Sequence, residues 1–522
     1  MQNEILTKGA GGEALYTDVT YASLYVKALS RRPNNIAFVW DGQQMTYRQL
    51  RDHISQSVQV LSDLGLERGD TVACLCRNSP FAIVLWASCA VLGLRYTPLN
   101  PLGSVETDDF IIQKAKVRAV LVDTDSFAER ARGAAERDNP VDFVLALNGG
   151  DIGLDFKALC SAKTARQLKV EANPEDVIAI FFTGGTTGEP KGVMHTSRSL
   201  VANAMISSCE WEWPAKIDIL LATPVSHAAG YMVLPVLLRG GTVHLHDGFS
   251  PERFLKAVAA KEINTSFMVP TMIYTVLDTP GVEEVDFSHL EMVAYGAAPI
   301  SIPRLHQAID LFGPVLMQGY GQTEAPNSVM TLYPSCHEGE RFRSCGMPLA
   351  GITVKILDES LQEVPAGEVG EICIRGPLVM EGYLDNPEET ARALQGGWLH
   401  TGDVGYQDED GFVYLIDRLK DLIISGGFNV YPKEIEDIVA GHPAVADVAV
   451  VGVPDDKWGE AVVAAVVLYA GQSVPEQVLI DAVREDKGTV YAPKKIVFME
   501  EGLPKTALGK PDKKELRRLL SQ

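Results

Sequence analysis

The sequence lacks the features that most quickly assign a class of protein. Its eight cysteines include no C-x-x-C pair, so neither a zinc site nor a disulfide framework is indicated. Lysine and arginine number 46 against 68 acidic residues, and this formal charge of −22 argues against nucleic acid as a main partner. The longest apolar run, residues 81–94, is too short to span a bilayer and predicts a buried helix.

Targeting and common catalytic signatures are also missing. Residues 1–16 are mixed and polar, with no hydrophobic signal segment, so we expect a cytoplasmic protein with reduced, packed cysteines. No G-x-S-x-G sequence occurs, which removes the usual signature of an α/β-hydrolase. A Walker A loop needs Gly directly before its Lys and a hydroxyl residue after it, whereas Lys191 lies between Pro190 and Gly192.

One glycine- and threonine-rich segment suits a different kind of phosphate site. Residues 183–192 read TGGTTGEPKG and follow an apolar run, residues 177–182, that predicts a buried strand. Glycines let backbone N–H groups approach an anion, threonines add hydroxyl donors, and Lys191 adds a positive charge. A surface turn of the same composition is the alternative, and the other motifs of the chain decide between the two.

Length and hydrophobic pattern predict at least two domains. Strand and helix patterns alternate through most of the 522 residues, which predicts parallel sheets covered by helices. From residue 351 the pattern becomes β-rich, and roughly the last hundred residues predict a small α+β unit. The expected fold class is α/β, with a large N-terminal domain (1–419) of parallel-rich sheets covered by helices plus a β-rich subdomain, and a small mobile C-terminal domain (420–522).

A second glycine-containing segment follows the strand predicted at residues 315–317. It reads GYGQTE over residues 319–324. Ligands of open α/β sheets bind where strands end at their carboxyl edge. Because this segment and the glycine-rich segment both leave strands, we expect them to share one site.

Five motifs together resemble those of the adenylate-forming superfamily, which includes acyl-CoA synthetases, peptide-synthetase adenylation domains and firefly-type luciferases. They are TGGTTGEPKG (183–192), YGQTE (320–324), TGD (401–403), DRLKD (417–421) and PKTALGK (504–510), and their order covers essentially the whole chain. The resemblance implies two half-reactions. A carboxylate attacks the α-phosphate of ATP, giving an acyl-adenylate and pyrophosphate, and a thiol then displaces AMP.

The resemblance assigns most of the motif residues to ATP. Groups of the first motif would hold the phosphates, and Glu324 would bind Mg²⁺. Asp403 would accept hydrogen bonds from the ribose hydroxyls, and Tyr320 would present its ring to adenine. The predicted ATP- and AMP-binding residues are Thr183, Gly184, Gly185, Thr186, Thr187, Gly188, Lys191, Gly296, Ala297, Ala298, Tyr320, Gly321, Thr323, Asp403 and Arg418. A solvated loop carboxylate, a core tyrosine and a surface ion pair are the alternative interpretations of Glu324, Tyr320 and Arg418.

Lys510 would be the main catalytic group of the first half-reaction. An anionic carboxylate must approach an anionic phosphate, so the transition state needs positive charge between them. A lysine on a separate domain can enter for that step and leave afterwards, with Lys420 as the hinge; a solvated face of a C-terminal helix is the alternative. The remaining predicted catalytic residues are Thr323, Glu324 and His227, with His227 closer to a pocket wall than to a general base.

The resemblance also assigns residues to the thiol and to the acid. The coenzyme A tunnel would be lined by Gly426, Gly427 and Trp458, and the acyl pocket by His227, Tyr231, Gly296 and Gly319. Because Gly319 leaves space beside Tyr320, we expect an apolar acid, medium- to long-chain or ring-bearing, rather than acetate.

The leading hypothesis is an ATP-dependent, AMP-forming carboxylate–CoA ligase that uses ATP, Mg²⁺ and coenzyme A. Two alternatives stay open: a stand-alone adenylating enzyme that loads a carrier protein, and a nucleotide-binding protein that has lost catalysis. Loss of catalysis is disfavoured because the chain retains Lys191, Glu324, Asp403 and Lys510. The expected partners are small molecules, and a homodimer is left open.

Overall fold

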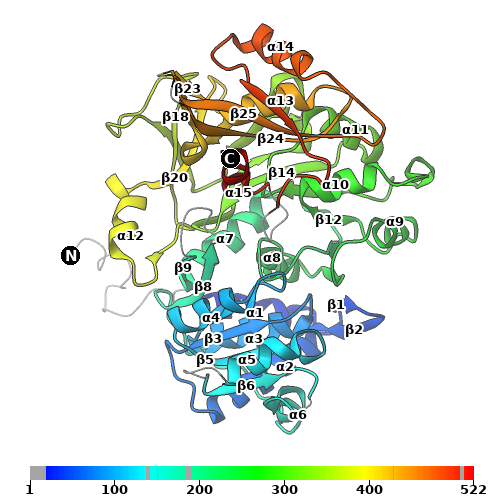
Figure 1. The fold of residues 1–522 in the computed structure, drawn as a ribbon. Coiled ribbons are helices and arrows are strands. Elements are labelled where there is room, and N and C mark those ends of the chain that lie inside the picture. The colour runs from blue at the N-terminus through cyan, green and yellow to red at the C-terminus, as the bar shows by residue number, and fades with distance from the viewer. Residues whose placement is uncertain are drawn as a thin grey trace, which may run out of the picture.

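The computed structural model describes residues 19–136, 141–149, 151–183, 190–426, 428–455, 457–505 and 511–521. Its strands form three sheets, of which two are built from residues before 419 and the third from residues after 422 (Figure 1). The predicted fold class, a large α/β part with a β-rich subdomain and a small α+β part, is confirmed. The boundary at Lys420 stays a prediction; a 3₁₀ turn, Leu419–Asp421, links the two parts there.

The largest sheet has thirteen strands and two halves of different character. Its parallel half joins neighbours such as β12, β13 and β14, and its antiparallel half begins where β14 turns back into β15. In spatial order its strands are β17 (Thr353–Leu357), β18 (Gly370–Arg375), β20 (Leu399–Gln407), β21 (Val413–Arg418), β16 (Ser344–Pro348), β15 (Ala325–Leu332), β14 (Leu316–Gln322), β13 (Met292–Gly296), β12 (Thr265–Met268), β10 (Asp218–Leu221), β11 (Thr242–Leu245), β1 (Ile36–Trp40) and β2 (Gln43–Thr46).

The second sheet has eight strands and is mostly parallel. Only its edge pairs, β19 with β9 and β9 with β8, run antiparallel among the described strands. In spatial order the strands are β19 (Gly382–Tyr383), β9 (Lys191–Thr196), β8 (Val177–Thr183), β4 (Arg95–Pro98), β3 (Thr71–Leu75), β5 (Val117–Val122), β6 (Phe143–Ala146) and β7 (Leu154–Asp155). The β8–β9 hairpin brings Thr183 opposite Lys191, so the two ends of the glycine-rich segment lie side by side.

Helices of this large part pack on both sheets, and one of them is enclosed completely. The apolar run predicted as a buried helix forms α3, and every residue of it except Phe81 is buried. A helix that is hydrophobic on all sides belongs inside a protein. The helices of the large part are α1 (Tyr21–Arg31), α2 (Tyr47–Asp63), α3 (Pro80–Leu92), α4 (Val105–Lys114), α5 (Thr124–Glu136), α6 (Phe156–Ser161), α7 (Ser197–Glu210), α8 (Gly230–Arg239), α9 (Pro251–Ala259), α10 (Pro270–Leu277), α11 (Ile302–Phe312) and α12 (Pro387–Ala393).

The small C-terminal part has its own five-stranded sheet and apolar core. In Figure 1 this sheet lies at the opposite end of the molecule from the blue and cyan strands of the second sheet. Its elements are β22 (Ile423–Ser425), β23 (Phe428–Val430), α13 (Pro432–Ala440), β24 (Val445–Asp455), β25 (Gly459–Leu468), α14 (Glu476–Lys487), β26 (Lys495–Phe498) and α15 (Lys513–Leu520). A partly buried ion pair between Lys513 and Glu436 ties α15 to α13.

Several expectations about local structure need correction. Residues 319–322 are not a loop but continue strand β14, because antiparallel pairing with β15 extends the strand beyond its parallel neighbour β13. The TGD motif likewise lies within β20, although Gly402 keeps a positive φ of 69°. All eight cysteines are free as expected, but Cys209 is exposed rather than packed. Within the described residues, no helix is long and apolar enough to cross a membrane.

Candidate functional site

The β13–β14 strand pair forms one wall of the predicted site. Gly296 and Gly319 face each other in register, and a Cβ added to Gly296 would lie 2.3 Å from the carbonyl oxygen of Gly319. Only glycine therefore fits at position 296. The next residue, Ala297, has a φ of +65°, a conformation that costs a non-glycine residue energy and is found most often at functional sites.

Gly319 itself is under no such constraint. Its φ is not positive, and an added Cβ would lie 3.4 Å from the Asn327 carbonyl oxygen and 3.7 Å from Trp211, which are ordinary contacts. A side chain could be built here, so the absence of one leaves space. Gly321 differs, because a Cβ there would lie 2.6 Å from the Asn327 nitrogen.

Asp403 is the best-defined anionic group of the site. Its carboxylate is buried and Oδ2 accepts a hydrogen bond from the Tyr320 hydroxyl at 2.6 Å. Burial and the neighbouring Asp403 raise the pKa of Tyr320 well above its ordinary value, so this hydroxyl remains a donor. Nε of Arg418 lies 3.0 Å from Oδ1, yet Oδ1 has no aligned hydrogen bond within the described part of the chain. A buried acceptor with remaining capacity suits a hydroxyl donor from a ligand.

Lys191 and Glu324, the predicted phosphate and magnesium ligands, are linked through Tyr383. The Tyr383 hydroxyl donates to Oε1 of Glu324 at 2.7 Å, and Nζ of Lys191 lies 5.2 Å from the centre of the Tyr383 ring. Lys191 also forms an ion pair with Glu389 on α12. A carboxylate has two oxygens, so Glu324 can keep the Tyr383 bond and offer Oε2 to a hard cation such as Mg²⁺.

A buried histidine fixes the turn that carries Thr323 and Glu324. His195 on β9 is fully buried; its Nε2 lies 2.8 Å from the Thr323 carbonyl oxygen and its Nδ1 3.2 Å from the Ser199 hydroxyl. Burial lowers the pKa of His195 to about 4, so the ring is neutral near pH 7. It therefore donates one hydrogen bond from Nε2 to Thr323, and its Nδ1 is left as an acceptor beside the Ser199 hydroxyl.

His227 lies in the turn before α8, and Tyr231, four residues later, is in the first turn of that helix. Nδ1 of His227 is 2.8 Å from the Ser226 hydroxyl, and burial lowers the pKa of His227. The Tyr231 hydroxyl is buried and has no hydrogen-bond partner among the described residues. Burial, with the charge of Glu324 as a second cause, raises the pKa of Tyr231 well above its ordinary value.

The residues predicted to meet coenzyme A belong to the C-terminal part. Gly426 donates its N–H to the Trp458 carbonyl at 2.7 Å, and its φ is +60°. Ammonium groups of Lys457 and Lys494 lie 5.0 and 4.7 Å from the Trp458 ring centre. Burial, together with the neighbouring charges of Arg484 and Lys457, lowers the pKa of Lys494. The surface around Trp458 therefore combines an aromatic ring with two lysines.

Several predicted residues lie outside the described residues. They are Gly184, Gly185, Thr186, Thr187, Gly188, Gly427 and Lys510. The roles predicted for these positions stay predictions. Lys420 belongs to the 3₁₀ turn between the two parts, and its role as hinge also stays a prediction.

Sequence reasoning missed His195, Tyr383 and Glu389. The sequence does carry a signal for the last two, because GYLDNPEET at 382–390 places an aromatic before a short helix whose first turn contains two acids. The pairing of β19 with β9, which brings this segment to Lys191, cannot be read from a two-residue strand. His195 gives no signal, since a lone histidine in a strand is usually a core residue.

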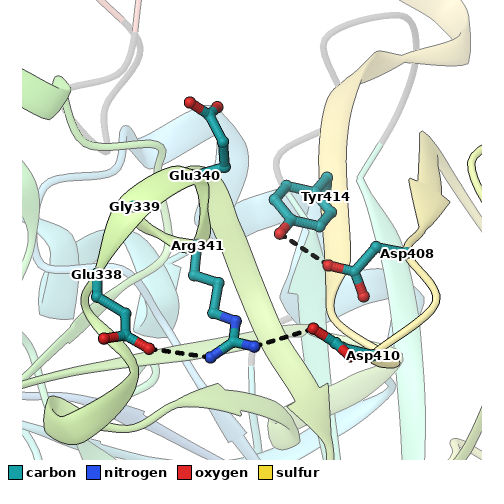
Figure 2. A pocket seen from close by; sticks show the side chains of 7 residues that line it. All are labelled: Glu338, Gly339, Glu340, Arg341, Asp408, Asp410 and Tyr414. Carbon is teal, nitrogen blue, oxygen red and sulfur yellow. Dashed lines mark hydrogen bonds and ion pairs between the residues drawn. The ribbon is translucent and has the colours of Figure 1, made fainter.

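A separate acidic cavity of about 450 Å³ lies at the surface of the β-rich subdomain (Figure 2). It is lined by Glu338, Gly339, Glu340, Arg341, Asp408, Asp410 and Tyr414, none of which was predicted to take part in the site. Arg341 bonds to Glu338 and Asp410, and the Tyr414 hydroxyl donates to Asp408. Its charged groups are thus largely paired with one another.

The large α/β part, the small C-terminal part and the site between β8, β14 and β20 define a two-part nucleotide-binding architecture. Comparison with known sequences makes this specific. Residues 26–384 match the family described as AMP-binding enzyme, and residues 434–510 match the AMP-binding enzyme C-terminal domain. The chain belongs to this family and is an acid–thiol ligase of it, and the resemblance to adenylate-forming enzymes is confirmed.

Individual relatives cover nearly the whole chain. A medium/long-chain-fatty-acid–CoA ligase of Mycobacterium tuberculosis is 40% identical over 97% of this chain and 91% of its own length. A fatty acid–[acyl-carrier-protein] ligase of Streptomyces coeruleorubidus is 33% identical over 93% of both. The structure of ATP-bound MatB from Rhodopseudomonas palustris superposes with a TM-score of 0.88 at 28% identity, covering 97% of this chain and 99% of its own, whereas apo MatB gives 0.79 at the same identity and coverage.

Proposed function

We propose that this chain activates an apolar carboxylic acid with ATP and Mg²⁺, releases pyrophosphate, and transfers the acyl group of the acyl-adenylate to coenzyme A. The observation that carries the proposal is the buried Asp403 carboxylate, which Tyr320 holds at Oδ2 and which faces Arg418 at Oδ1 without accepting an aligned hydrogen bond there from the described residues. A ribose presents two adjacent hydroxyl donors, which is the complement of such a group. Tyr320 then has its ring beside the base and its hydroxyl on Asp403.

The phosphates would lie between the glycine-rich segment and Glu324. Lys191 ends that segment and supplies positive charge at β9. Mg²⁺, when bound, would neutralise phosphate charge, and Glu324 is the oxygen ligand that the chain offers it. ATP would have to compete with Glu389 for Lys191.

Lys510 would supply the remaining positive charge during attack of the carboxylate on the α-phosphate. Its contribution would be electrostatic, because it lowers the repulsion between two anionic reactants. The higher TM-score of ATP-bound MatB than of apo MatB supports an arrangement of the two parts like that of the nucleotide-bound relative. The small part would later turn about Lys420 so that the thiol can enter.

Coenzyme A is the acceptor that the C-terminal part favours. Its surface around Trp458 combines an indole with Lys457 and Lys494, and coenzyme A carries an adenine ring and several phosphates. A carrier-protein phosphopantetheine is the second candidate, because the Streptomyces coeruleorubidus relative is a ligase of that kind.

The acid would lie between α8 and the β13–β14 wall. His227 and Tyr231 are neutral and largely buried, and Gly319 leaves space opposite them. These features favour an apolar medium- to long-chain or ring-bearing acid. The identity to the Mycobacterium tuberculosis ligase supports the chain-length part of this proposal.

The test measures pyrophosphate release over a graded panel of carboxylic acids, with free coenzyme A and a holo carrier protein as separate acceptors. We expect AMP and acyl-CoA in equal amounts with apolar acids and little activity with acetate. Product with the carrier protein alone would favour the second candidate. Absence of nucleotide cleavage with every acid would mean that the chain binds nucleotide without this chemistry.

A further inference from the structure

A carboxylate, a thiol and an imidazole converge on one face of the adjacent strands β18 and β20. Glu371 and Cys373 lie two residues apart on β18, so their side chains point to the same face, and Cys373 is opposite His400 of β20 in register. Nδ1 of His400 lies 2.7 Å from Oε2 of Glu371 and 3.5 Å from Sγ of Cys373. One donor atom from each of the three residues lies within 4.8 Å of the other two.

The contacts of His400 direct its Nδ1 towards the cluster. Nε2 lies 3.2 Å from the Gln395 carbonyl oxygen, which can only accept, so Nε2 is placed to donate away from the cluster. In that tautomer the lone pair of Nδ1 is directed at Glu371 and Cys373 and can bind a metal ion.

The hydrogen bonds outside the cluster match those of a metal site. Histidines that bind metals usually donate their other N–H to a backbone carbonyl, as His400 does to Gln395. Bound carboxylates are also hydrogen-bonded from behind, and Oε1 of Glu371 accepts from the Gly402 N–H at 2.9 Å. Cys373 adds a sulfur ligand, which selects a borderline or soft ion over Mg²⁺.

We propose that Glu371, Cys373 and His400 form a site for a divalent transition metal, with Zn²⁺ as the best fit. Tetrahedral Zn²⁺ with bonds of about 2.0–2.3 Å places its ligand atoms roughly 3.3–3.7 Å apart. The Cys373–His400 separation of 3.5 Å already meets this value, and Glu371 needs to withdraw by only about 0.6 Å. The side chains of Glu371 and His400 are 21% and 14% exposed, which gives an ion access and leaves a fourth position for water.

Such a site is separate from the magnesium ligand Glu324 but close to the nucleotide-binding strand. Oε1 of Glu371 bonds to Gly402, the residue immediately before Asp403. A metal ion would therefore join β18 to β20 and hold the turn that carries Asp403. Separated residues on two strands, rather than a C-x-x-C pair, form the cluster, which explains why the sequence pattern gave no indication of zinc.

Cobalt substitution tests the proposal on the full-length, chelator-treated protein. We expect one Co²⁺ per chain to produce a thiolate-to-cobalt charge-transfer band and tetrahedral visible bands, both abolished by Zn²⁺. Cys373→Ser should lose the band and weaken metal binding by more than the roughly 10–100-fold typical for loss of an outer hydrogen-bond partner. Cys209→Ser removes an exposed thiol outside the cluster and should behave as the wild type.

X-ray absorption of the Zn²⁺-loaded wild type provides a measurement that does not depend on how a variant folds. It should show one sulfur and three nitrogen or oxygen ligands. Absence of a charge-transfer band in the wild type, or a shell without sulfur, would overturn the proposal and leave a hydrogen bond between His400 and Glu371. An unchanged band in folded Cys373→Ser would overturn it as well.

Discussion

Asp403 and Asp417 lie on neighbouring strands, but they serve different regions of the molecule. In the β20–β21 ladder Asp403 pairs with Arg418 and Val404 pairs with Asp417, so the two acids are adjacent in the sheet. Both are buried. Asp403 receives its hydrogen bond from Tyr320 in the large part, whereas Oδ2 of Asp417 accepts from the Lys433 N–H at 2.7 Å, at the start of α13 in the small part.

These different partners indicate different tasks: Asp403 is placed to bind a ligand, and Asp417 joins the two parts. Asp403 keeps an unused acceptor, as a ligand-binding group should. Asp417 has both oxygens engaged, because Oδ1 also accepts from the Arg418 N–H. Near this junction Leu419, Ile424 and Phe428 each expose more than half of their surface. The junction thus combines exposed apolar side chains with one buried carboxylate.

The largest expected effect is that of Lys510, a residue of the small part that would act on reactants bound to the large part. Lys510→Ala should lower the rate of acyl-adenylate formation by about 10²–10³-fold, since it removes charge stabilisation from the transition state. Thiolation of a supplied acyl-adenylate should be largely intact. Single-turnover assays of each half-reaction measure the two rates. Equal loss of both steps would show that Lys510 does not have this step-specific role.

Replacing Asp403 and Asp417 separately should distinguish the binding of ATP from the joining of the two parts. Asp403→Asn should weaken ATP binding by about 10–150-fold, because a hydrogen bond to a charged group contributes about 1.5–3 kcal/mol. Asp417→Asn is the matched variant, and its ATP dissociation constant should stay within about twofold of wild type. Calorimetric titration with a non-hydrolysable ATP analogue measures both. Similar losses in the two variants would contradict the separation.

In the large part, His195 should make stability rise with pH. Burial lowers its pKa to about 4 from an unfolded value of about 6.5, so the unfolded chain binds more protons between these values. Stability is therefore lost as pH falls through this window, by on the order of 2 kcal/mol. His195→Gln should flatten this dependence, measured as the urea midpoint from pH 4 to 7. Exposed His306→Gln is the control and should keep the wild-type slope.

At the junction, Asp417 should produce the opposite slope. Burial raises its pKa to about 6 from an unfolded value of about 3.9, so the folded chain binds more protons in this window. The contribution of Asp417 to stability therefore falls as pH rises from about 4 to 6, by on the order of 2 kcal/mol. Asp417→Asn should remove this fall from the same urea series. If the stability of the variant depended on pH as that of the wild type does, Asp417 would not be the source of this dependence.

The smallest expected effect concerns the ion pair that occupies Lys191. Glu389→Gln should free Lys191 for phosphate and lower the KM for ATP by up to about fivefold, since partly exposed ion pairs contribute at most about 1 kcal/mol. Arg392→Gln changes the exposed partner on the other side of Glu389 and should have less effect. An increase in KM in Glu389→Gln would instead mean that Glu389 positions Lys191 for catalysis.

The elements that could be predicted from the sequence are those specified by a local pattern of residues. The apolar run at residues 81–94 forms the buried helix α3, the run at 177–182 forms most of strand β8, and the fold class follows from alternation of strands and helices. Sequence reasoning mistook residues 319–322 for a loop, because strand continuation depends on a partner, β15, from the following residues.

The same limit applies to the site. Motifs indicated Asp403, Tyr320 and Glu324, since each carries its chemistry in its own residue type and spacing. His195, Tyr383 and Glu389 act through partners that only long-range pairing supplies: Thr323, Glu324 and Lys191 are each more than fifty residues away along the chain. Which arrangement the two parts adopt also depends on few contacts, such as Asp417 with Lys433, that no local pattern encodes.

The central claim, activation of an acid through an acyl-adenylate, is tested most directly by oxygen transfer. The enzyme would be given ATP, coenzyme A and an apolar acid with ¹⁸O in both carboxyl positions, and AMP and pyrophosphate would be analysed by mass spectrometry. Attack of the carboxylate on the α-phosphate followed by thiolysis at the acyl carbon predicts one ¹⁸O in AMP and none in pyrophosphate. Unlabelled AMP, or label in pyrophosphate, would contradict the account.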